Sequence, residues 1–296
     1  MIELPGSTSF LLQSEALVMQ KLDQNIVQGI LPKRKNESYK TNYGRVLLIG
    51  GNEEMGGAIM IAASGAVYSG AGLVTVATHP NNHAALHGRL PEAMVLNAYH
   101  SEKLINQIKK SDVIVIGPGL GLEKEALDIL KTVLATVSSH QQIVIDGSAI
   151  TLMAQENLKT PKAKTVYTPH LGEWQRLSKL KPEEQTKDLN AHFRKQLNAT
   201  VVLKKHHSEI YFEDEVWQNT AGNPAMATGG MGDALTGMLA GFLAQFPNHK
   251  TAVLASVFLH SYIADQLAKT HYVTLPTQII QLIPKTMKDF ATKFDF

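Results

Sequence analysis

The sequence contains no cysteine and carries little net charge. Without cysteine among its 296 residues, disulfides, thiolate nucleophiles and cysteine-ligated metal sites are excluded. The formal net charge is only +2, and without a dominant basic run it gives no sign of a nucleic-acid partner. Residues 1–20 include Glu3 and Glu15 and lack a basic start, so no signal peptide is predicted. These absences favour a cytoplasmic location.

One long stretch lacks charge altogether. No charged side chain occurs between Gly56 and Gly88, but glycine and serine interrupt this stretch repeatedly. A membrane-spanning helix would need about 20 predominantly apolar residues. We therefore interpret the stretch as a helix of small residues followed by a buried strand within an α/β layer, and we expect no membrane partner.

Short apolar runs alternate with helical patterns along most of the chain. This alternation predicts a mainly parallel central sheet with helices on both faces. The predicted strands cover residues 45–49, 73–77, 112–117, 142–146, 164–167 and 200–204, and a hairpin covers 209–212 and 215–217. The predicted helices cover residues 58–69, 123–137, 184–197, about 251–267 and 278–292.

The whole chain, residues 1–296, is expected to form one domain. With 44% hydrophobic and 18% charged residues, it can bury a sizeable core. Apolar residues at helical spacing in residues 1–31 and a polar segment in residues 32–41 predict a helical lead-in and linker over residues 1–40. Residues 41–296 would then form the catalytic core.

Polar and glycine residues follow several of the predicted strands. In parallel sheets, ligands bind beyond the carboxyl ends of the strands. Five strand ends therefore meet at one candidate edge: Gly50-Gly51, Gly117-Pro-Gly119, Asp146, Thr168-Pro-His170 and Lys204. Each has a structural alternative, such as a tight turn for the glycines, a helix cap for Asp146 and an exposed basic turn for Lys204–Ser208.

The stretch from Asn223 to Gly237 carries the strongest functional signal. Its glycines precede a helical pattern, so free amides and the positive end of a helix dipole should form an anion site. One carboxylate, Asp233, lies at the same place. An acid there suits removal of a proton while a phosphoryl group is held nearby. The structural alternative is that Asp233 caps the helix.

Two common nucleotide motifs are missing. The glycines at Gly50-Gly51 and Gly56-Gly57 lack the G-x-G-x-x-G spacing, and no acidic residue ends the next strand. No Walker loop occurs either. A dinucleotide-binding dehydrogenase and a P-loop enzyme are therefore disfavoured.

Taken together, the motifs resemble the ADP/ATP-dependent NAD(P)H-hydrate dehydratases, a family of the ribokinase-like superfamily. The resemblance extends from about residue 31 onward, and the chain looks like a stand-alone dehydratase domain without a preceding epimerase. It rests on Leu31-Pro-Lys-Arg34, Gly44–Gly51, Gly70–Val74, Gly117–Gly121, Asp146-Gly147, Thr168–Glu173, Val201–Lys204 and Asn223–Asp233.

This resemblance implies an activity and a set of site residues. The enzyme would phosphorylate the 6-hydroxyl of hydrated NADH or NADPH, and loss of phosphate would restore the reduced ring, with Asp233 as the base. The hydrated dinucleotide would contact Ala58, Gly119, His170 and Asp233. The adenine nucleotide would contact Lys204, Lys205, His206, His207, Ser208 and Gly232. An anion hole would comprise Gly229, Gly230, Met231 and Gly232.

The resemblance also implies cofactors and an assembly. Mg²⁺ would bridge the phosphates of ADP or ATP, with Glu173 ordering one of its waters; from the residues alone, Glu173 could equally complement the helix dipole. Relatives commonly form homotetramers. Lys205 and His206-His207 depart from the family pattern. Two alternatives stay open, a ribokinase-like kinase acting on a vitamin precursor or sugar, and a non-catalytic nucleotide-binding module.

Overall fold

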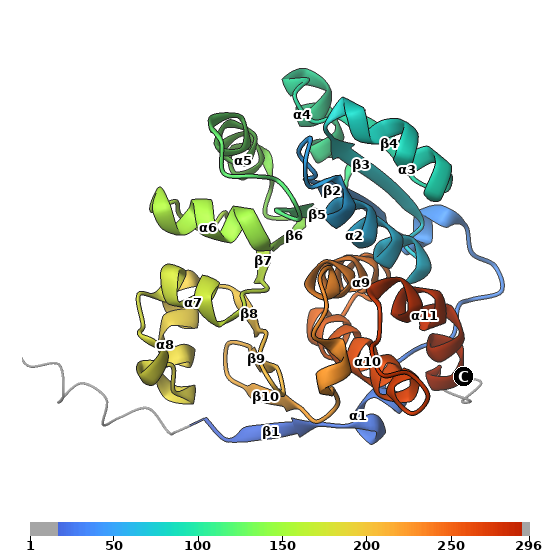
Figure 1. Cartoon of the computed structure of the whole chain (residues 1–296), viewed down its shortest axis with the longest axis vertical. Coiled ribbons are helices and arrows are strands. Elements are labelled where there is room, and N and C mark those ends of the chain that lie inside the picture. Colours follow the sequence, from blue (N-terminus) through green and yellow to red (C-terminus); the bar gives the residue numbers. More distant parts are fainter. Residues whose placement is uncertain (1–16, 292–296) are drawn as a thin grey trace, which may run out of the picture.

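The computed structural model describes residues 17–291, and its centre is a ten-stranded sheet (Figure 1). The strands lie in the order β1-β10-β9-β8-β7-β6-β5-β2-β3-β4. Neighbours are parallel except for β8–β9 and β9–β10. The strands are β1 (Met19–Leu22), β2 (Arg45–Ile49), β3 (Leu73–Thr78), β4 (Met94–Asn97), β5 (Val113–Ile116), β6 (Gln142–Ile145), β7 (Lys164–Tyr167), β8 (Thr200–Leu203), β9 (Glu209–Tyr211) and β10 (Val216–Asn219).

Helices cover both faces of this sheet, as predicted (Figure 1). Helices α2, α9, α10 and α11 lie on one face, and α5, α6, α7 and α8 lie on the other. The helices are α1 (Gln24–Gln28), α2 (Gly56–Tyr68), α3 (His83–Arg89), α4 (Ser101–Lys110), α5 (Lys124–Thr136), α6 (Gly147–Gln155), α7 (Leu171–Ser178), α8 (Lys187–Leu197), α9 (Met231–Gln245), α10 (His249–Ala268) and α11 (Pro276–Phe290). Short 3₁₀ turns are η1 (Lys40–Tyr43), η2 (Pro80–Asn82), η3 (Pro182–Glu184) and η4 (Pro224–Met226).

The continuous apolar strands reflect burial of both faces of the sheet. In β2, Val46 and Leu48 join one core cluster while Leu47 and Ile49 join the other. Successive side chains of a strand point to opposite faces, so a strand covered on both sides needs apolar residues at every position.

The uncharged stretch after residue 56 packs against the start of the glycine-rich helix. A β-carbon on Gly237 would lie 1.9 Å from the Ala62 carbonyl oxygen, and one on Gly241 would lie 2.9 Å from the Ala66 carbonyl oxygen. Glycine is therefore required where the backbones of α2 and α9 approach each other. Since the paired positions advance together along both helices, α2 and α9 run parallel and begin at the same edge of the sheet.

The predicted helical lead-in is wrong for part of its length. Residues 19–22 form β1, which pairs in parallel with β10, and of the residues from 17 to 31 only Gln24–Gln28 form a helix. The β9–β10 hairpin would otherwise end the sheet with an unpaired edge, and β1 covers it. The apolar positions Leu11, Leu12 and Ala16 lie outside the described residues.

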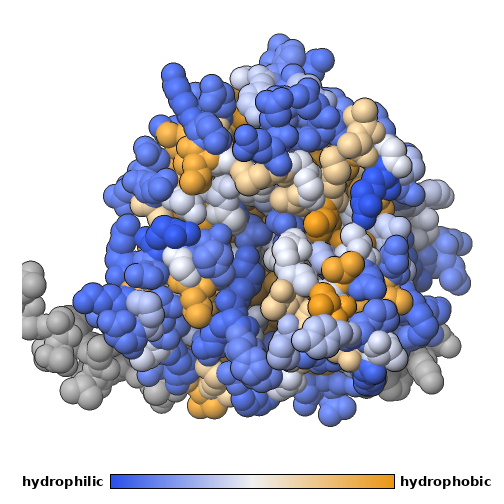
Figure 2. Space-filling model, viewed as in Figure 1, coloured by the Kyte–Doolittle hydropathy of each residue, from blue (hydrophilic) through white to orange (hydrophobic). Residues whose placement is uncertain are grey.

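The order of the strands reverses between β2 and β5. From β2 the chain proceeds to β3 and β4 on one side, whereas β5 is followed by β6, β7 and β8 on the other. The carboxyl ends of the strands at such a switch point commonly bound a ligand crevice. None of the helices within residues 17–291 has the length and apolar character needed to cross a membrane. Figure 2 shows hydrophilic residues over most of one face, with hydrophobic residues in small separate groups.

Candidate active site

A buried charge cluster occupies the carboxyl edge of the sheet. Lys204 follows β8, and its Nζ lies 2.8 Å from Oδ1 of Asp146, which follows β6. The other oxygen of Asp146 accepts a hydrogen bond of 2.8 Å from the Thr236 hydroxyl on α9. Asp146 is buried and the Lys204 side chain is only 20% exposed. The pair thus ties two strand ends to the first turns of α9.

The start of α9 has the free amides that the sequence predicted for an anion site. Gly230 precedes the helix with φ +84°, a conformation that favours glycine, and no side chain caps the helix. The first helical amides, of Met231, Gly232 and Asp233, have no hydrogen-bond partner among residues 17–291. A β-carbon on Gly232 would lie 3.2 Å from the Lys204 ammonium. Free amides and a fixed cation therefore meet at one point.

Asp233 projects from this same turn without a partner. Its carboxylate makes no hydrogen bond or ion pair with any residue in the described range, so the alternative that Asp233 caps α9 is wrong. Burial raises the pKa of Asp233 to about 7, Asp146 adds to the shift and Lys204 opposes it. A carboxyl group with a pKa close to neutral suits general-base catalysis.

The electrostatics of Lys204 follow from its surroundings. Burial lowers the pKa of Lys204, but the carboxylates of Asp146 and Glu173 outweigh this effect and the pKa is raised. Lys204 therefore stays charged, and its ammonium is available beside Gly232 for an anionic ligand.

His170 and Glu173 close the cluster at the start of α7. The backbone of His170 forms an isolated parallel bridge with Lys204, which brings the ends of β7 and β8 together. His170 Nδ1 accepts hydrogen bonds from the amides of Gly172 and Glu173, at 3.0 and 3.3 Å. Since Nδ1 accepts, Nε2 carries the proton and remains available as a donor. The His170 side chain is 56% exposed, so a ligand can reach it.

Glu173 caps the start of α7 and is also a candidate to accept a hydrogen bond from a metal-bound water. Its Oε2 accepts a hydrogen bond of 2.8 Å from the His170 amide, while Oε1 lies 3.6 Å from His170 Nε2. Burial raises the pKa of Glu173, and Lys204 opposes that shift. Within residues 17–291, no three histidine, aspartate or glutamate side chains are placed to hold a metal ion. The donor set fits Mg²⁺ only if phosphates and water supply most of its ligands.

Ala58 and Gly119 meet at the switch point of the sheet. Gly119 has φ +60°, and a β-carbon there would lie 3.1 Å from the Ala58 β-carbon and 2.4 Å from the Met55 carbonyl oxygen. The loop after β5 also accepts hydrogen bonds from the loop after β2, through Pro118 and Gly119. The Ala58 end of α2 and the Asp233 end of α9 lie at the same edge. The structure therefore places both residues at the carboxyl edge of the sheet, where the sequence predicted a ligand.

In the turn from Lys205 to Ser208, the side chains interact with neighbours in the sequence. Lys205 forms an ion pair of 2.7 Å with Glu209 rather than contacting Asp146 or Asp233. The rings of His206 and His207 lie 4.1 Å apart. His207 has φ +57° and a buried Nδ1 without a partner in the described part of the chain. The structure brings Gly232 to Lys204 but does not bring the Lys205 ammonium to the same point.

Two polar residues near the site were not predicted from the sequence. Thr236 is fully buried and hydrogen-bonded to Asp146, and a hydroxyl within the apolar stripe of α9 was the available signal. His260 on α10 is buried beside the backbone of Met231, and burial lowers its pKa to about 4. The possible helix-capping role of Asp146 is wrong, because its side chain does not cap α6.

The sequence and fold of this chain are similar to those of several known proteins. Residues 46–285 match the family model described as NAD(P)H-hydrate dehydratase. A curated ADP-dependent (S)-NAD(P)H-hydrate dehydratase of Lactiplantibacillus plantarum is 50% identical over 273 residues, covering 92% of this chain and 98% of that protein. A crystal structure of a ribokinase-like superfamily protein from Enterococcus faecalis superposes with a TM-score of 0.90 at 48% identity, covering 94% and 99% of the two chains.

A second solved structure was obtained with a ligand. It is an ADP/ATP-dependent NAD(P)H-hydrate dehydratase from Bacillus subtilis, co-crystallised with ATP and Mg²⁺. It superposes with a TM-score of 0.83 at 29% identity, covering 93% of this chain and 100% of that chain. These neighbours confirm the ribokinase-like fold that the sequence predicted.

Proposed function

The chain belongs to the NAD(P)H-hydrate dehydratase family, and we propose that Asp233 is the general base of this reaction here. The enzyme is a nucleotide-dependent lyase that returns the S-epimer of hydrated NADH or NADPH to the reduced dinucleotide. This assignment rests on the carboxylate of Asp233 at the uncapped start of α9. It has no partner among the described residues, and its pKa is raised to about 7. A base with that pKa is substantially ionised near neutral pH and accepts a proton without a large energetic cost.

The proposed reaction begins at the 6-hydroxyl of the hydrated ring. Asp233 takes the hydroxyl proton as the oxygen attacks the terminal phosphoryl group of the nucleotide. The free amides of Met231 and Gly232 donate hydrogen bonds to the phosphoryl oxygens, where negative charge develops. Phosphate then leaves carbon 6 with its bonding electron pair, and carbon 5 loses a proton to the departing phosphate. The double bond that forms between carbons 5 and 6 restores the dihydropyridine ring. Phosphate is a much better leaving group than hydroxide, which is the chemical reason for consuming a nucleotide.

Lys204 and its neighbours would hold the nucleotide. The ammonium is fixed by Asp146 and lies beside Gly232, where it can bind a phosphate. The turn of Lys205, His206, His207 and Ser208 would contact the rest of the nucleotide, with Lys205 first giving up its ion pair with Glu209. The relatives named ADP-dependent support ADP as the preferred co-substrate.

Ala58, Gly119 and His170 would bind the hydrated dinucleotide. The left-handed backbone of Gly119 and the small side chain of Ala58 allow close approach at the switch point, while His170 offers its Nε2 proton as a donor. Bound Mg²⁺ would neutralise part of the phosphate charge, with Glu173 ordering one of its waters. The co-crystal of a relative with ATP and Mg²⁺ supports this assignment.

A turnover assay tests the proposal directly. Purified protein is mixed with hydrated NADH, Mg²⁺ and either ADP or ATP, and the absorbance of regenerated NADH is followed. Phosphate and AMP or ADP should accumulate in equal amounts with NADH. Accumulation of a stable phosphorylated alcohol from a vitamin precursor or sugar, without NADH formation, would instead favour the kinase alternative.

Three further expectations remain predictions of the proposal. The chain should act as a single domain, with residues 41–296 as its catalytic core, and limited proteolysis should yield no smaller active fragment of that core. It should assemble as a homotetramer, which light scattering after size-exclusion chromatography measures. The cytoplasmic location, which fractionation would test, also remains a prediction.

A further inference from the structure

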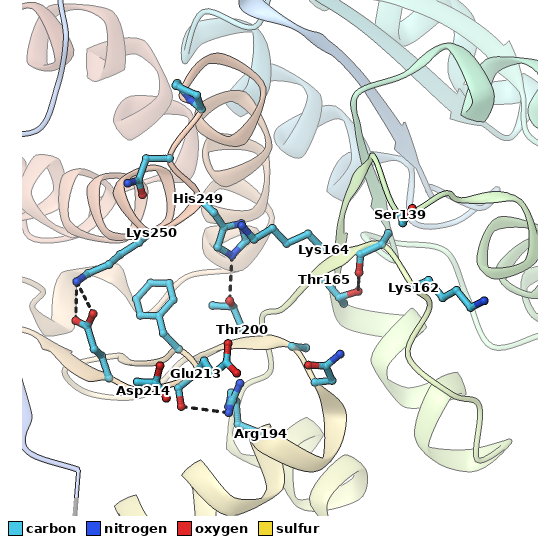
Figure 3. A pocket seen from close by; sticks show the side chains of 17 residues that line it. Ser139, Lys162, Lys164, Thr165, Arg194, Thr200, Glu213, Asp214, His249 and Lys250 are labelled. Atoms are coloured by element: carbon cyan, nitrogen blue, oxygen red, sulfur yellow. Dashed lines mark hydrogen bonds and ion pairs between the residues drawn. The ribbon is translucent and has the colours of Figure 1, made fainter.

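A cavity lies at the edge of the sheet opposite the proposed active site. Its volume is about 710 Å³, and it is bounded by the start of β7, the start of β8, the turn between β9 and β10, and the start of α10 (Figure 3). Lys164 is the first residue of β7, and Thr200 is the first residue of β8. In contrast, Asp146 and Lys204 come directly after the last residues of β6 and β8. This volume is in the range that accommodates a small-molecule ligand.

A hydrogen-bond chain fixes one wall of the cavity. The side-chain Nε2 of Gln142 donates to the Leu243 carbonyl oxygen at 3.1 Å, so the Oε1 of the same side chain accepts from His249 Nδ1 at 2.7 Å. His249 Nε2 then accepts from the Thr200 hydroxyl at 3.0 Å, as drawn in Figure 3. Burial lowers the pKa of His249 to about 4, and the nearby Lys164 contributes. His249 is therefore a neutral structural residue that anchors the start of α10.

The anchored end of α10 presents free amides to the cavity. Asn248 caps the helix by accepting a hydrogen bond of 3.0 Å from the Thr251 amide. The amides of His249 and Lys250 have no partner among residues 17–291, and both residues line the cavity. The positive end of a helix dipole favours a negatively charged group at this position.

Arg194 provides an independent indication of a missing ligand. Its side chain lines the cavity although the residue is only 6% exposed. A guanidinium has five N–H donors, yet the described residues supply one acceptor, the Glu213 carbonyl oxygen at 3.3 Å. Its buried Nε has no partner among the described residues. Buried polar groups are nearly always satisfied, so the guanidinium is under-satisfied and retains donors that a bound anion could accept from.

The remaining charges around the cavity divide it into two sides. The ammonium of Lys250 is already paired with Glu215, at 2.6 Å. Lys162 and Lys164 form no ion pair within the described range. The carboxylates of Glu213 and Asp214, on the exposed turn beside Arg194, also line the cavity. The lining of the cavity thus combines cations that have no ion pair in the described range with carboxylates that can accept hydrogen bonds from hydroxyl groups.

We propose that this cavity binds a phosphorylated sugar or nucleotide, with its phosphate between Lys164, Arg194 and the first amides of α10. The carboxylates of Glu213 and Asp214 accept hydrogen bonds from the ligand hydroxyls. The site is separate from the dehydratase site, and the inference does not depend on the proposed reaction.

Calorimetric titration of the full chain tests the site with three probes: inorganic phosphate, ribose 5-phosphate and AMP. Lys164→Gln should weaken binding of ribose 5-phosphate about tenfold, and Lys164→Glu should weaken it further, because one charged hydrogen-bond partner is lost or reversed. Lys131→Gln, which changes an exposed lysine on α5, is the matched control and should bind as the wild type does. A stronger response to ribose 5-phosphate or AMP than to inorganic phosphate would identify the hydroxyl-bearing part as a determinant.

AMP should also bind at the proposed active site, so its titration should show two binding events in the wild type and one in Lys164→Glu. Difference density for ribose 5-phosphate between Lys164 and Arg194 in a soaked crystal would support the assignment. The proposal is overturned if none of the probes binds, or if the Lys164 variants bind all three with wild-type affinity. It is also overturned if inorganic phosphate binds as tightly as ribose 5-phosphate and AMP, because the site then selects no phosphorylated metabolite.

Discussion

Replacing Asp233 by asparagine should abolish turnover and, at the same time, stabilise the folded protein above neutral pH. The substitution removes the proposed base but preserves the size and polarity of the side chain. Because Asp233 has no hydrogen-bond or ion-pair partner in the described part of the chain, no stabilising contact is lost. What is removed is a carboxylate that ionises less readily in the folded protein than in the unfolded chain.

The magnitude of the stability change follows from the pKa shift. Folding raises the pKa of Asp233 from 3.8 to about 7, and each pKa unit corresponds to about 1.4 kcal/mol. The protonated form is favoured in the folded state, so this contribution is present below the unfolded pKa and is lost as pH rises towards 7. If Asp233 were fully buried, its ionisation would reduce the free energy of unfolding by about 4 kcal/mol above pH 7. Because water can enter an open site, we expect a reduction of about 1–2 kcal/mol.

Two measurements on the same variant check this reasoning. Dehydratase turnover should fall by about 10²–10⁴-fold, as expected when a general base is lost, while nucleotide affinity at saturating Mg²⁺ changes by less than about threefold. The melting temperature at pH 8 should rise by about 2–6 °C, and the gain should shrink towards pH 4. Asp128→Asn, which alters an exposed acid on α5, should change neither quantity. Wild-type turnover would remove Asp233 from the mechanism, and an unchanged melting temperature at pH 8 would show that its carboxylate is well solvated.

Three other substitutions test the surroundings of the site. Lys204→Met should weaken nucleotide binding at least about tenfold, as measured by calorimetry. It should also destabilise the fold by about 3 kcal/mol in chemical denaturation, because Asp146 loses its buried partner. Adding Asp146→Asn should recover the stability but not the nucleotide binding. Gly237→Ala should cost about 2–4 kcal/mol, since its β-carbon would lie 1.9 Å from a carbonyl oxygen of α2, whereas Gly88→Ala has open space and should stabilise by about 0.5–1 kcal/mol. Glu173→Gln should keep the cap of α7 and the melting temperature but raise the Mg²⁺ concentration needed for half-maximal turnover several-fold; an unchanged Mg²⁺ requirement would exclude the water-mediated role.

Most of the sheet could be predicted because its strands are buried on both faces. Such strands have unbroken apolar runs, and those of β2, β5 and β6 stand out from their polar flanks. Two edge strands were missed. β1 contains Gln20 and Lys21 beside apolar residues, and the half-exposed β4 has no fully buried position. Edge strands bury less surface, so their sequences carry less of the pattern that identifies a strand.

The location of the site was predictable, but its internal pairing was not. Asp146, Lys204 and the glycine-rich start of α9 were expected at one edge because parallel strands end together. That Asp146 bonds Lys204 with one oxygen and Thr236 with the other depends on side-chain directions that spacing does not specify. The ion pair that holds Lys205 away from the cluster depends on Glu209, at the start of the following strand. These contacts are set by tertiary packing.

The charge balance of the cluster leads to a final prediction about nucleotide binding. Among the described residues, Lys204 is the one lysine or arginine facing three carboxylates, those of Asp146, Glu173 and Asp233, so full ionisation leaves two negative charges uncompensated. A nucleotide brings further negative charge to the same point. Binding should therefore be linked to uptake of a proton by Asp233 or to Mg²⁺. Without Mg²⁺, ADP affinity should fall as pH rises through about 7, by up to about tenfold per pH unit. With saturating Mg²⁺ this dependence should weaken, and in Asp233→Asn it should disappear. Equal pH dependence in the wild type and in Asp233→Asn, measured by calorimetry, would show that the linked proton belongs to another group.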